Sequence, residues 1–314
     1  MLRRKGVALI VLCVAVSLAF TAAVFGQAKY TLDKKLVVGF VQMDNSQPWR
    51  TAETDSFKNE AANYNIDLKY VDAQDSQANQ IKALRSFIAQ KVDAIIFPPK
   101  VETGWEPVLR EAKAAHIPVI LVDRGITVSD QSLYVSLLAS DFVFEGQQAA
   151  KWLAKAVNGK ANIVELQGTA GSSPAIDRKK GFDEVIAQNP GIKILVSQTA
   201  QFTRATANST MENLMQAYPS FDAVFGANDE MIIGAIEAMS SGGIDPSKKV
   251  TVGYDATTDA LDYIKQGKLG ATVDQFPGKQ AAQALQALVD YIKNKTMPAQ
   301  KVVYLSPDTV TSAK

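Results

Sequence analysis

The sequence predicts an α/β protein built from two doubly wound domains, each a parallel sheet with helices on both faces. The chain has 314 residues, which is about two domains at roughly 150 residues each. Short β-rich runs alternate with longer helical segments along the whole chain, and most of the runs are apolar throughout, as expected for parallel strands buried on both faces. Each half holds about five such runs, which favours two sheets over one large sheet.

Strands and helices alternate regularly in the first half. In the helical segment 77–90, apolar residues such as Leu84 and Phe87 recur on one face at a spacing of 3.6 residues. Thr103 and Glu106 have the spacing of a capping box at a helix start. The expected strands are 36–42, 67–71, 93–97, 118–122 and 134–138, and the expected helices are 52–65, 77–90 and 103–115.

The second half repeats this alternation. A Gly- and Ser-rich turn at 168–173 follows its first strand, and Gly242 and Gly243 provide a stop signal for the helix 231–241. The expected strands are 163–167, 194–198, 223–227, 250–254, 269–273 and 302–305. The expected helices are 144–157, 175–188, 205–217, 231–241, a short one after residue 255, and 279–294.

The first 26 residues have the layout of a secretory signal peptide. Arg3, Arg4 and Lys5 precede an apolar run at 7–19, and small residues lead to Gly26. Cleavage after Gly26 would remove three basic residues and change the net charge from +1 to −2. The alternative is a membrane anchor, for which the apolar run is short.

Composition excludes several classes of function. The chain has one Cys and one His, too few for a zinc finger, a Cys–His protease or an iron–sulfur cluster. The 33 basic and 32 acidic residues give no excess of charge that would indicate nucleic-acid binding. The first strand is followed by QMDNSQPWR rather than by a Gly-rich nucleotide fingerprint. We therefore expect no metal, no cofactor and no nucleic-acid partner.

Polar side chains gather where the predicted strands end, and in doubly wound sheets the ligand site lies at the carboxyl ends of the strands. Carboxylates accept from hydroxyls, guanidinium groups donate to oxygens, and amides do both, so this set suits a neutral polyol. Aromatic rings can cover the apolar face of a sugar. The polar residues are Asp44, Asn45, Ser46, Arg50, Asp123, Arg124, Asn228, Asp229, Asp255, Asp274 and Gln275, and the aromatic candidates are Trp49, Trp105 and Phe202.

Each of these residues also has a structural interpretation. An Asp at a strand end often caps the next helix. Trp105 stands at a helix start, where packing is as reasonable as ligand contact, and Arg178 could brace a helix. Arg204 could be a solvated loop residue, and His116 has no visible acidic partner for catalysis.

At these strand ends the sequence resembles the periplasmic sugar-binding proteins of ABC transporters, in the ribose- and galactose-binding class and closest to its galactofuranose binders. The resemblance covers residue 35 to about residue 298. It is carried by VGFVQ with PWRTAE, NQIKALRSFIAQKVDAIIF, TGWEPVL, EAKAAHIPVILVDR, NIVELQG, AIDRKKGF, GANDEMIIGAIEA and GYDA.

The resemblance implies two α/β domains joined by a hinge of three strands, which close on the sugar. It places residues 35–139 and 276–300 in the first domain, and 140–275 and 301–314 in the second. The implied sugar contacts are Ser46, Gln47, Trp49, Arg50, Asp123, Arg124, Arg178, Asn228, Asp255 and Gln275. Galactofuranose binders carry a Gly before the Trp, an acidic residue at the start of the first loop and a carboxylate in place of Gln275, so the resemblance leaves the sugar open.

The function expected from this resemblance is capture of a monosaccharide, galactofuranose or a related pentose or hexose, and its delivery to the membrane permease of an ABC transporter. Such a protein is a monomer, works in the periplasm and is no enzyme. The alternatives are a sugar-sensing partner of a chemoreceptor or histidine kinase and, less favoured, an exported glycoside hydrolase. A transcription regulator of the same fold is disfavoured, because a signal peptide stands where its DNA-binding headpiece would be.

Overall fold

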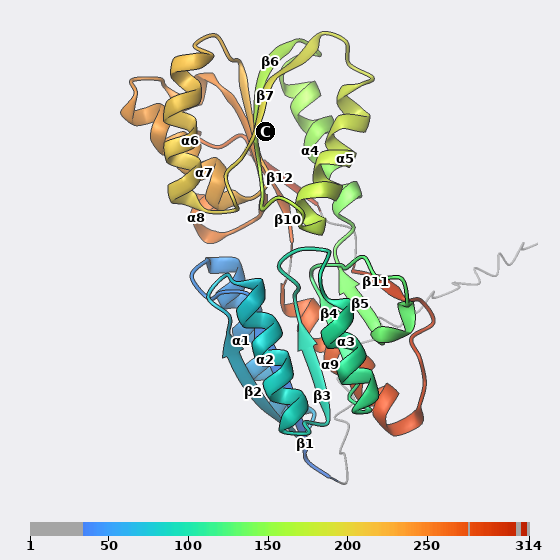
Figure 1. Cartoon of the computed structure of the whole chain (residues 1–314). Coiled ribbons are helices and arrows are strands. Elements are labelled where there is room, and N and C mark those ends of the chain that lie inside the picture. The colour runs from blue at the N-terminus through green and yellow to red at the C-terminus, as the bar shows by residue number, and fades with distance from the viewer. Residues whose placement is uncertain (1–33, 276, 306–308, 313–314) are drawn as a thin grey trace, which may run out of the picture.

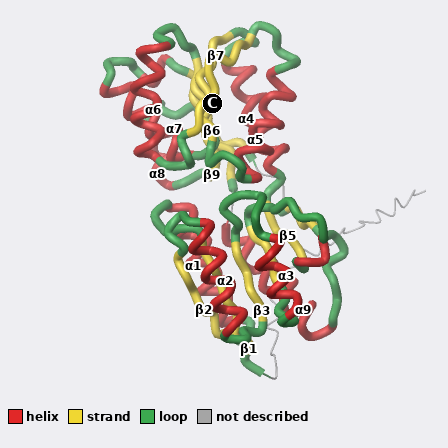
Figure 2. The backbone as a smooth tube through the Cα atoms, viewed as in Figure 1, coloured by secondary structure: helices red, strands yellow, loops and turns green. Residues whose placement is uncertain are grey.

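The computed structural model describes residues 34–275, 277–305 and 309–312, and the predicted signal peptide lies outside this part. The described chain forms two lobes, one above the other, each built on its own six-stranded sheet (Figure 1). Helices cover both faces of each sheet (Figure 2). The two doubly wound parallel-sheet domains predicted from the sequence are therefore confirmed.

The first lobe contains a fully parallel sheet in the order β11-β5-β4-β3-β1-β2. Helices α1 and α9 pack on one face, and α2 and α3 pack on the other. The strands are β1 (Leu36–Gln42), β2 (Ile66–Asp72), β3 (Ala94–Phe97), β4 (Val119–Val122), β5 (Ser136–Ala139) and β11 (Val302–Tyr304). The helices are α1 (Pro48–Asn63), α2 (Gln77–Ala89), α3 (Glu106–Ala114) and α9 (Pro277–Asn294), with a 3-10 turn at Gln131–Leu133.

The second lobe has the sheet order β12-β10-β9-β8-β6-β7, in which only β12 runs antiparallel to its neighbour. Helices α4 and α5 pack on one face, and α6, α7 and α8 pack on the other. The strands are β6 (Ala161–Gln167), β7 (Ile192–Thr199), β8 (Ala223–Gly226), β9 (Val250–Asp255), β10 (Ala271–Asp274) and β12 (Val310–Ser312). The helices are α4 (Phe142–Ala156), α5 (Ser173–Ile186), α6 (Arg204–Ala217), α7 (Asp229–Ser241) and α8 (Thr258–Lys265), with a 3-10 turn at Pro246–Lys248.

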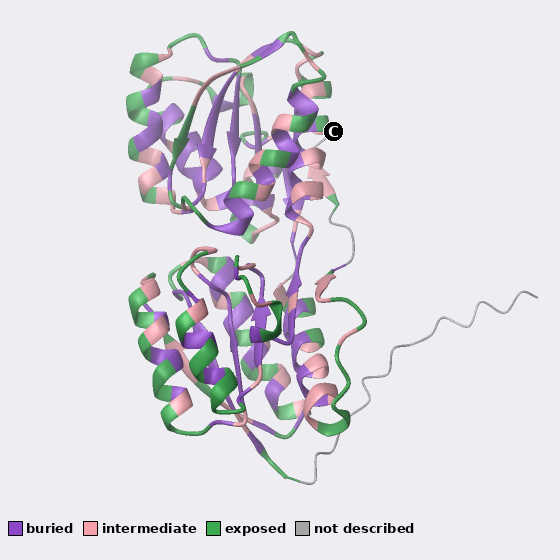
Figure 3. Ribbon diagram, turned by 45° about the vertical axis from the view of Figure 1, so that its right-hand side comes forward, coloured by how far each residue is buried: buried purple, intermediate pink, exposed green. Residues whose placement is uncertain are grey.

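The cores of both lobes lie between sheet and helices, and the strand interiors are buried (Figure 3). The central strands β3 and β4 are buried at every position, which agrees with their uniformly apolar sequence. None of the helices in the described residues is both long and apolar enough to cross a bilayer.

The start of α3 differs from its prediction. Trp105 occupies the N-cap position, and no side chain caps the helix. Glu106 instead accepts a hydrogen bond of 2.8 Å from the Ser129 hydroxyl and pairs with Arg110. The capping-box prediction is therefore wrong, because α3 begins at Glu106 itself and the Glu106 carboxylate contacts Ser129 and Arg110.

The chain passes between the lobes after β5, after β10 and after β11. The structure differs from the predicted domain boundary at residue 301, because Val302–Tyr304 pairs with β5 of the first sheet. Lys301 contributes to this pairing, since its carbonyl accepts from the Leu137 amide at 2.9 Å. This short apolar strand, β11, was predicted and forms the edge of the first sheet. The chain then crosses to β12 in the second lobe, a strand that was not predicted.

Candidate functional site

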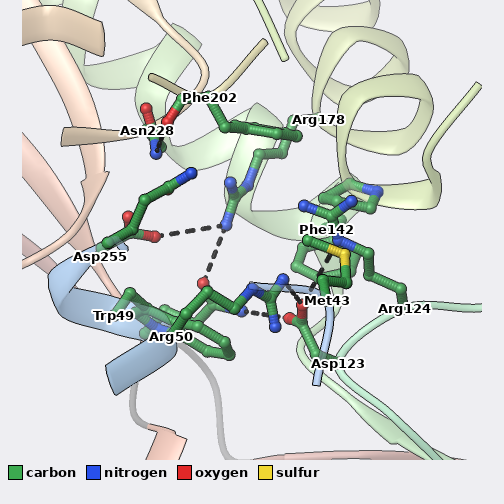
Figure 4. A pocket seen from close by; sticks show the side chains of 13 residues that line it. Met43, Trp49, Arg50, Asp123, Arg124, Phe142, Arg178, Phe202, Asn228 and Asp255 are labelled. Atoms are coloured by element: carbon green, nitrogen blue, oxygen red, sulfur yellow. Dashed lines mark hydrogen bonds and ion pairs between the residues drawn. The ribbon is translucent and has the colours of Figure 1, made fainter. Parts of the chain in front are cut away.

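A cleft lies between the lobes, at the carboxyl ends of both sheets (Figure 4). Its cavity has a volume of about 40 Å³, so the side chains of the two lobes lie close together around it. Its lining comes from both lobes and consists of Met43, Gln47, Trp49, Arg50, Asp123, Arg124, Phe142, Pro174, Arg178, Phe202, Asn228, Asp255 and Gln275.

Arg50 is the centre of a buried ion pair network in the first lobe. It lies in the first turn of α1 and contacts the Glu53 carboxylate at 2.7 Å and the Asp123 carboxylate by a short charge-assisted bond. The Gln42 amide donates to the same Glu53 oxygen at 2.9 Å. Burial by itself lowers the pKa of the Arg50 guanidinium, but the two carboxylates more than reverse this, so its pKa is raised and it stays charged.

Asp123 and Arg124 follow β4 directly. Asp123 has φ +59°, a left-handed conformation that few residues with a side chain adopt. Burial would raise the pKa of its carboxyl, but Arg50 and Arg124 outweigh that effect and hold the pKa below its ordinary value. Burial, together with repulsion from Arg50, lowers the pKa of Arg124 to about 9. Arg124 donates to the Lys100 carbonyl at 2.9 Å and lies 5.2 Å from the centre of the Phe202 ring.

Arg178 is the corresponding cation of the second lobe. It extends from α5, and Glu145 on α4 accepts from its Nε at 2.7 Å. Its remaining donors contact the Ala227 carbonyl at 2.7 Å and the side chains of Gln275 at 3.0 Å and Asp255 at 3.9 Å. The guanidinium is thereby fixed in one orientation, 3% exposed. Arg178 thus lines the cleft and also braces α5 against α4 through Glu145.

Gln275 connects the charged groups of the two lobes. It follows β10 at the point where the chain leaves the second lobe, and it is 4% exposed. Its amide nitrogen donates to Asp123 at 3.2 Å, while its amide oxygen accepts from Arg178 at 3.0 Å. An uncharged amide satisfies an anion on one side and a cation on the other.

Asp255 ends β9 and extends toward Arg178 (Figure 4). Its φ of +109° and the φ of +52° at Ala256 are both in a range that favours glycine. Burial raises the pKa of the Asp255 carboxyl well above its ordinary value. Arg178, 3.9 Å away, opposes this shift only in part. Asp255 and Asp123 thus share a cleft, but the pKa of Asp255 is raised and that of Asp123 is lowered.

Three aromatic side chains supply apolar surface in the cleft. Trp49 and Phe202 were expected there, and Phe142, at the start of α4, was not. Trp105 is not part of the site, because it is fully buried in the first lobe. The centres of its ring and the Phe97 ring lie 5.1 Å apart, and its Nε1 donates to the Val101 carbonyl at 2.6 Å. Packing under α3 therefore accounts for Trp105.

Nine of the ten predicted sugar contacts line the cleft, and Ser46 does not. The amide and hydroxyl of Ser46 both donate to Asp44, at 2.9 and 2.8 Å, in a turn outside the lining. Asn228 lines the cleft and also has a structural role, because it caps α7 through the Met231 amide at 2.9 Å and donates to the Phe202 carbonyl at 3.2 Å. Asp274 contacts the hydroxyls of Thr309 and Thr311 instead.

Sequence reasoning missed five residues of the site: Met43, Phe142 and Pro174 in the lining, and Glu53 and Glu145 behind it. Glu53 had a local signal, since it stands one helical turn after Arg50. Glu145 had none, because α4 and α5 bring it to Arg178 only in the folded lobe. Arg204 lies elsewhere, in ion pairs with Glu230 and Asp259.

The described residues contain no group of three or more His, Cys, Asp or Glu side chains placed to hold a metal ion. What the cleft offers is a fixed set of hydrogen-bonding groups. Two buried donors of the cleft residues, the Trp49 indole nitrogen and Arg124 Nε, have no hydrogen-bond partner within the described part of the chain. Donors of this kind match the ring and hydroxyl oxygens of a polyol.

Comparisons with known proteins identify the family of the chain. Residues 38–296 match the periplasmic binding protein domain. The galactofuranose-binding protein YtfQ of Escherichia coli K12 is 45% identical over 302 residues, which are 93% of this chain and 94% of that protein.

Two solved structures are similarly close. The periplasmic binding protein of the arabinose ABC transporter from Shewanella sp. ANA-3, bound to α- and β-L-arabinofuranose, is 44% identical with a TM-score of 0.85, over 88% of this chain and 92% of its own. A galactofuranose-binding protein is 46% identical with a TM-score of 0.86, over 88% and 95%. By sequence and by fold, the chain belongs to the periplasmic binding proteins.

Proposed function

We propose that this protein captures a neutral monosaccharide between its two lobes and delivers it to the membrane permease of an ABC importer. The sugar is a furanose-form hexose or pentose such as galactofuranose or arabinofuranose. These two ligands are named for the relatives with 44–46% identity to this chain. More distant relatives are named for ribose, fructose and xylitol, so the wider family binds sugars and sugar alcohols.

One observation supports a neutral ligand above all: Arg50 and Arg178, the central cation of each lobe, already have carboxylate partners. Arg50 is paired with Glu53 and Asp123, and Arg178 is paired with Glu145 and lies near Asp255. A charged ligand would leave one of these buried ions without its counter-charge, at a cost of several kcal/mol. Hydroxyl groups can instead add hydrogen bonds to the fixed ions.

The same pairing argues for binding rather than hydrolysis. A glycoside hydrolase needs one carboxyl that gives a proton and a second that acts as a base or nucleophile. Asp255, whose pKa burial raises, could hold a proton, but the oxygens of Asp123 are already engaged by Arg50 and Gln275, so Asp123 is not free to act as the base or nucleophile. We infer that its role is to accept hydrogen bonds from sugar hydroxyls.

The family also supports an extracytoplasmic location, with residues 1–26 as the export signal. We assign 35–139 and 277–304 to one sugar-holding lobe, and 140–275 and 309–312 to the other. The protein acts as a monomer with the permease as its membrane partner. A role in signalling to a chemoreceptor or kinase has no specific support from the cleft.

Isothermal titration calorimetry with galactose, arabinose, fucose, ribose, fructose and xylitol tests the proposal. We expect micromolar or tighter binding of at least one furanose-forming sugar, with a stoichiometry of one. A parallel assay for reducing sugar released from galactofuranosides and arabinofuranosides should detect none. Absence of binding across the panel, or turnover, would contradict the proposal.

A further inference from the structure

A buried carboxylate lies directly behind the cleft without lining it. Asp229 is the first residue of α7 and is fully buried. Its two oxygens accept hydrogen bonds from the Thr257 amide at 2.8 Å, the Thr257 hydroxyl at 3.2 Å and the Thr272 hydroxyl at 2.7 Å. All of these partners flank or lie beside the turn that follows β9.

That turn presents Asp255 to the cleft, and its backbone has an unusual conformation that other groups must stabilise. Asp255 and Ala256 have successive positive φ values, +109° and +52°. Residues with a Cβ adopt such conformations where surrounding contacts enforce them. The orientation of the Asp255 carboxyl therefore depends on the groups that fix the two following amides.

Both of those amides are fixed through Asp229. The Thr257 amide donates to it directly. The Ala256 amide donates a hydrogen bond to the Thr272 hydroxyl at 3.1 Å, and that hydroxyl in turn donates a hydrogen bond to Asp229. The amides of two consecutive residues are thus held by one carboxylate: Thr257 directly, and Ala256 through the Thr272 hydroxyl.

The sheet is shaped to admit this carboxylate. Gly253, in β9, faces Asp229, and a Cβ at that position would lie 2.6 Å from the nearer Asp229 oxygen. A side chain there would push the carboxylate away from the turn. The Thr257 hydroxyl, which also donates to Asp229, caps α8 by accepting from the Ala260 amide at 3.3 Å.

We propose that Asp229 is a positioning residue for sugar binding: through Thr257 and the Thr272 relay, it holds the Asp255 turn in the conformation that presents Asp255 to the sugar. This rests on the proposed function, because it assigns Asp255 a hydrogen bond to the ligand. It predicts that Asp229 affects affinity only through Asp255, although it does not line the cleft.

A double-mutant cycle tests this coupling, with galactose and arabinose as probes. Asp229→Asn and Thr272→Val should each weaken binding by about tenfold or more, the effect of losing one or two buried hydrogen bonds. In an Asp255→Ala background, the same two changes should have almost no further effect. NMR titration at millimolar sugar measures the weak complexes of the doubly changed proteins.

Two comparisons separate positioning from general loss of structure. Thr272→Ser keeps the hydroxyl and should restore the affinity that Thr272→Val loses. Asp222→Asn is the matched control and should leave sugar affinity unchanged. Asp222 lies in the same lobe, away from the cleft, and accepts a hydrogen bond from the backbone amide of Asn162 at 2.8 Å. If Asp229→Asn does not fold, the Thr272 pair of variants still decides the question.

The possible failures are distinguishable. Equal losses of affinity with and without the Asp255 side chain, or no loss in either background, would overturn the positioning role while leaving the proposed function intact. If the unchanged protein binds neither these probes nor any other sugar of the calorimetric panel, the proposed function itself fails, and the positioning role fails with it.

Discussion

Asp123 shows how a single position combines backbone strain, charge and burial. Its left-handed backbone follows a fully buried strand and turns the carboxylate toward Arg50. The guanidinium groups of Arg50 and Arg124 keep it ionised, although only 3% of the residue is exposed. The carboxylate is thereby a fixed acceptor that needs no reorganisation when a sugar hydroxyl arrives.

Replacing this acceptor should abolish tight binding. In Asp123→Asn, Arg50 loses half of its counter-charge and the cleft loses an ionised acceptor, so we expect sugar affinity to fall by at least about a hundredfold, roughly 3 kcal/mol. Calorimetry measures the loss. The control is Asp130→Asn, which changes a half-buried carboxylate of the same lobe that caps a 3-10 turn through Ser132. Unchanged affinity in Asp123→Asn would remove Asp123 from the site.

Asp229 gives the protein a distinct dependence on pH. Burial raises the pKa of its carboxyl from 3.8 to about 7, so the folded protein binds a proton more tightly than the unfolded chain does. This contribution to stability is complete below about pH 4 and is lost as the pH rises toward 7. From pH 5 to pH 7, the melting temperature of the wild type should therefore fall relative to that of Asp229→Asn. Parallel melting curves for the two proteins would contradict the raised pKa.

At the scale of elements, the close packing of α4 against α5 places Arg178. Glycines let the two helices approach. A Cβ at Gly181 would lie 2.0 Å from the Val143 carbonyl, and one at Gly146 would lie 2.2 Å from the carbonyl of Arg178 itself. Such contacts are tighter than real side chains tolerate, so neither position can accept alanine without moving a helix.

Gly181→Ala should therefore affect both stability and binding. Overpacking a close helix pair costs about 1–3 kcal/mol, and a shift of α5 would move the Arg178 guanidinium away from Glu145. Urea unfolding measures the first effect and sugar titration the second. Gly278→Ala in α9 is the matched control, because its nearest neighbour, the Ser56 hydroxyl, would be 3.6 Å away. Equal behaviour of the two variants would contradict the close approach.

The sequence predicted strands better than helix starts, and the reason is local. Strands β1, β3 and β4 are apolar runs buried on both faces, so their composition alone defines them. Helices α1, α5 and α9 begin two to four residues earlier than predicted, and each has a proline in its first turn. The fixed φ and the missing amide hydrogen of proline suit the first turn of a helix, so these prolines lie inside the helices. Helices α4 and α7 also begin two residues early, without a proline.

At the scale of the whole molecule, the lobes contact each other directly at the edge of the cleft. The Glu102 amide donates to the Gly171 carbonyl at 2.9 Å, and the Gly125 amide donates to the Ser173 hydroxyl at 2.9 Å. Together with the Gln275 bridge, these bonds hold the lobes in a closed arrangement. Closing therefore forms hydrogen bonds between protein groups as well as between protein and sugar.

Ser173→Ala tests this contribution of the cleft edge. The closed arrangement would lose one hydrogen bond, whereas in separated lobes water would hydrate both groups. We expect the sugar dissociation constant to rise about fivefold, for a net hydrogen bond of about 1 kcal/mol, with little change in unfolding free energy. Ser247→Ala, at the 3-10 turn of the second lobe, should leave affinity as it is. An affinity of Ser173→Ala equal to that of the wild type would show that this contact does not favour closing.

The sequence by itself determined the two-lobed α/β architecture and the strand ends at which most of the binding groups stand. Both follow from local patterns: apolar runs that must be buried, and polar residues directly after them. Only the tertiary structure decided which groups meet. Arg50 reaches Asp123 across 73 residues, and Gln275 reaches Asp123 across 152. The first pair forms within one lobe, where two strand ends of the same sheet come together, and the second forms where the hinge brings the two sheets together. No periodicity along the chain encodes either distance.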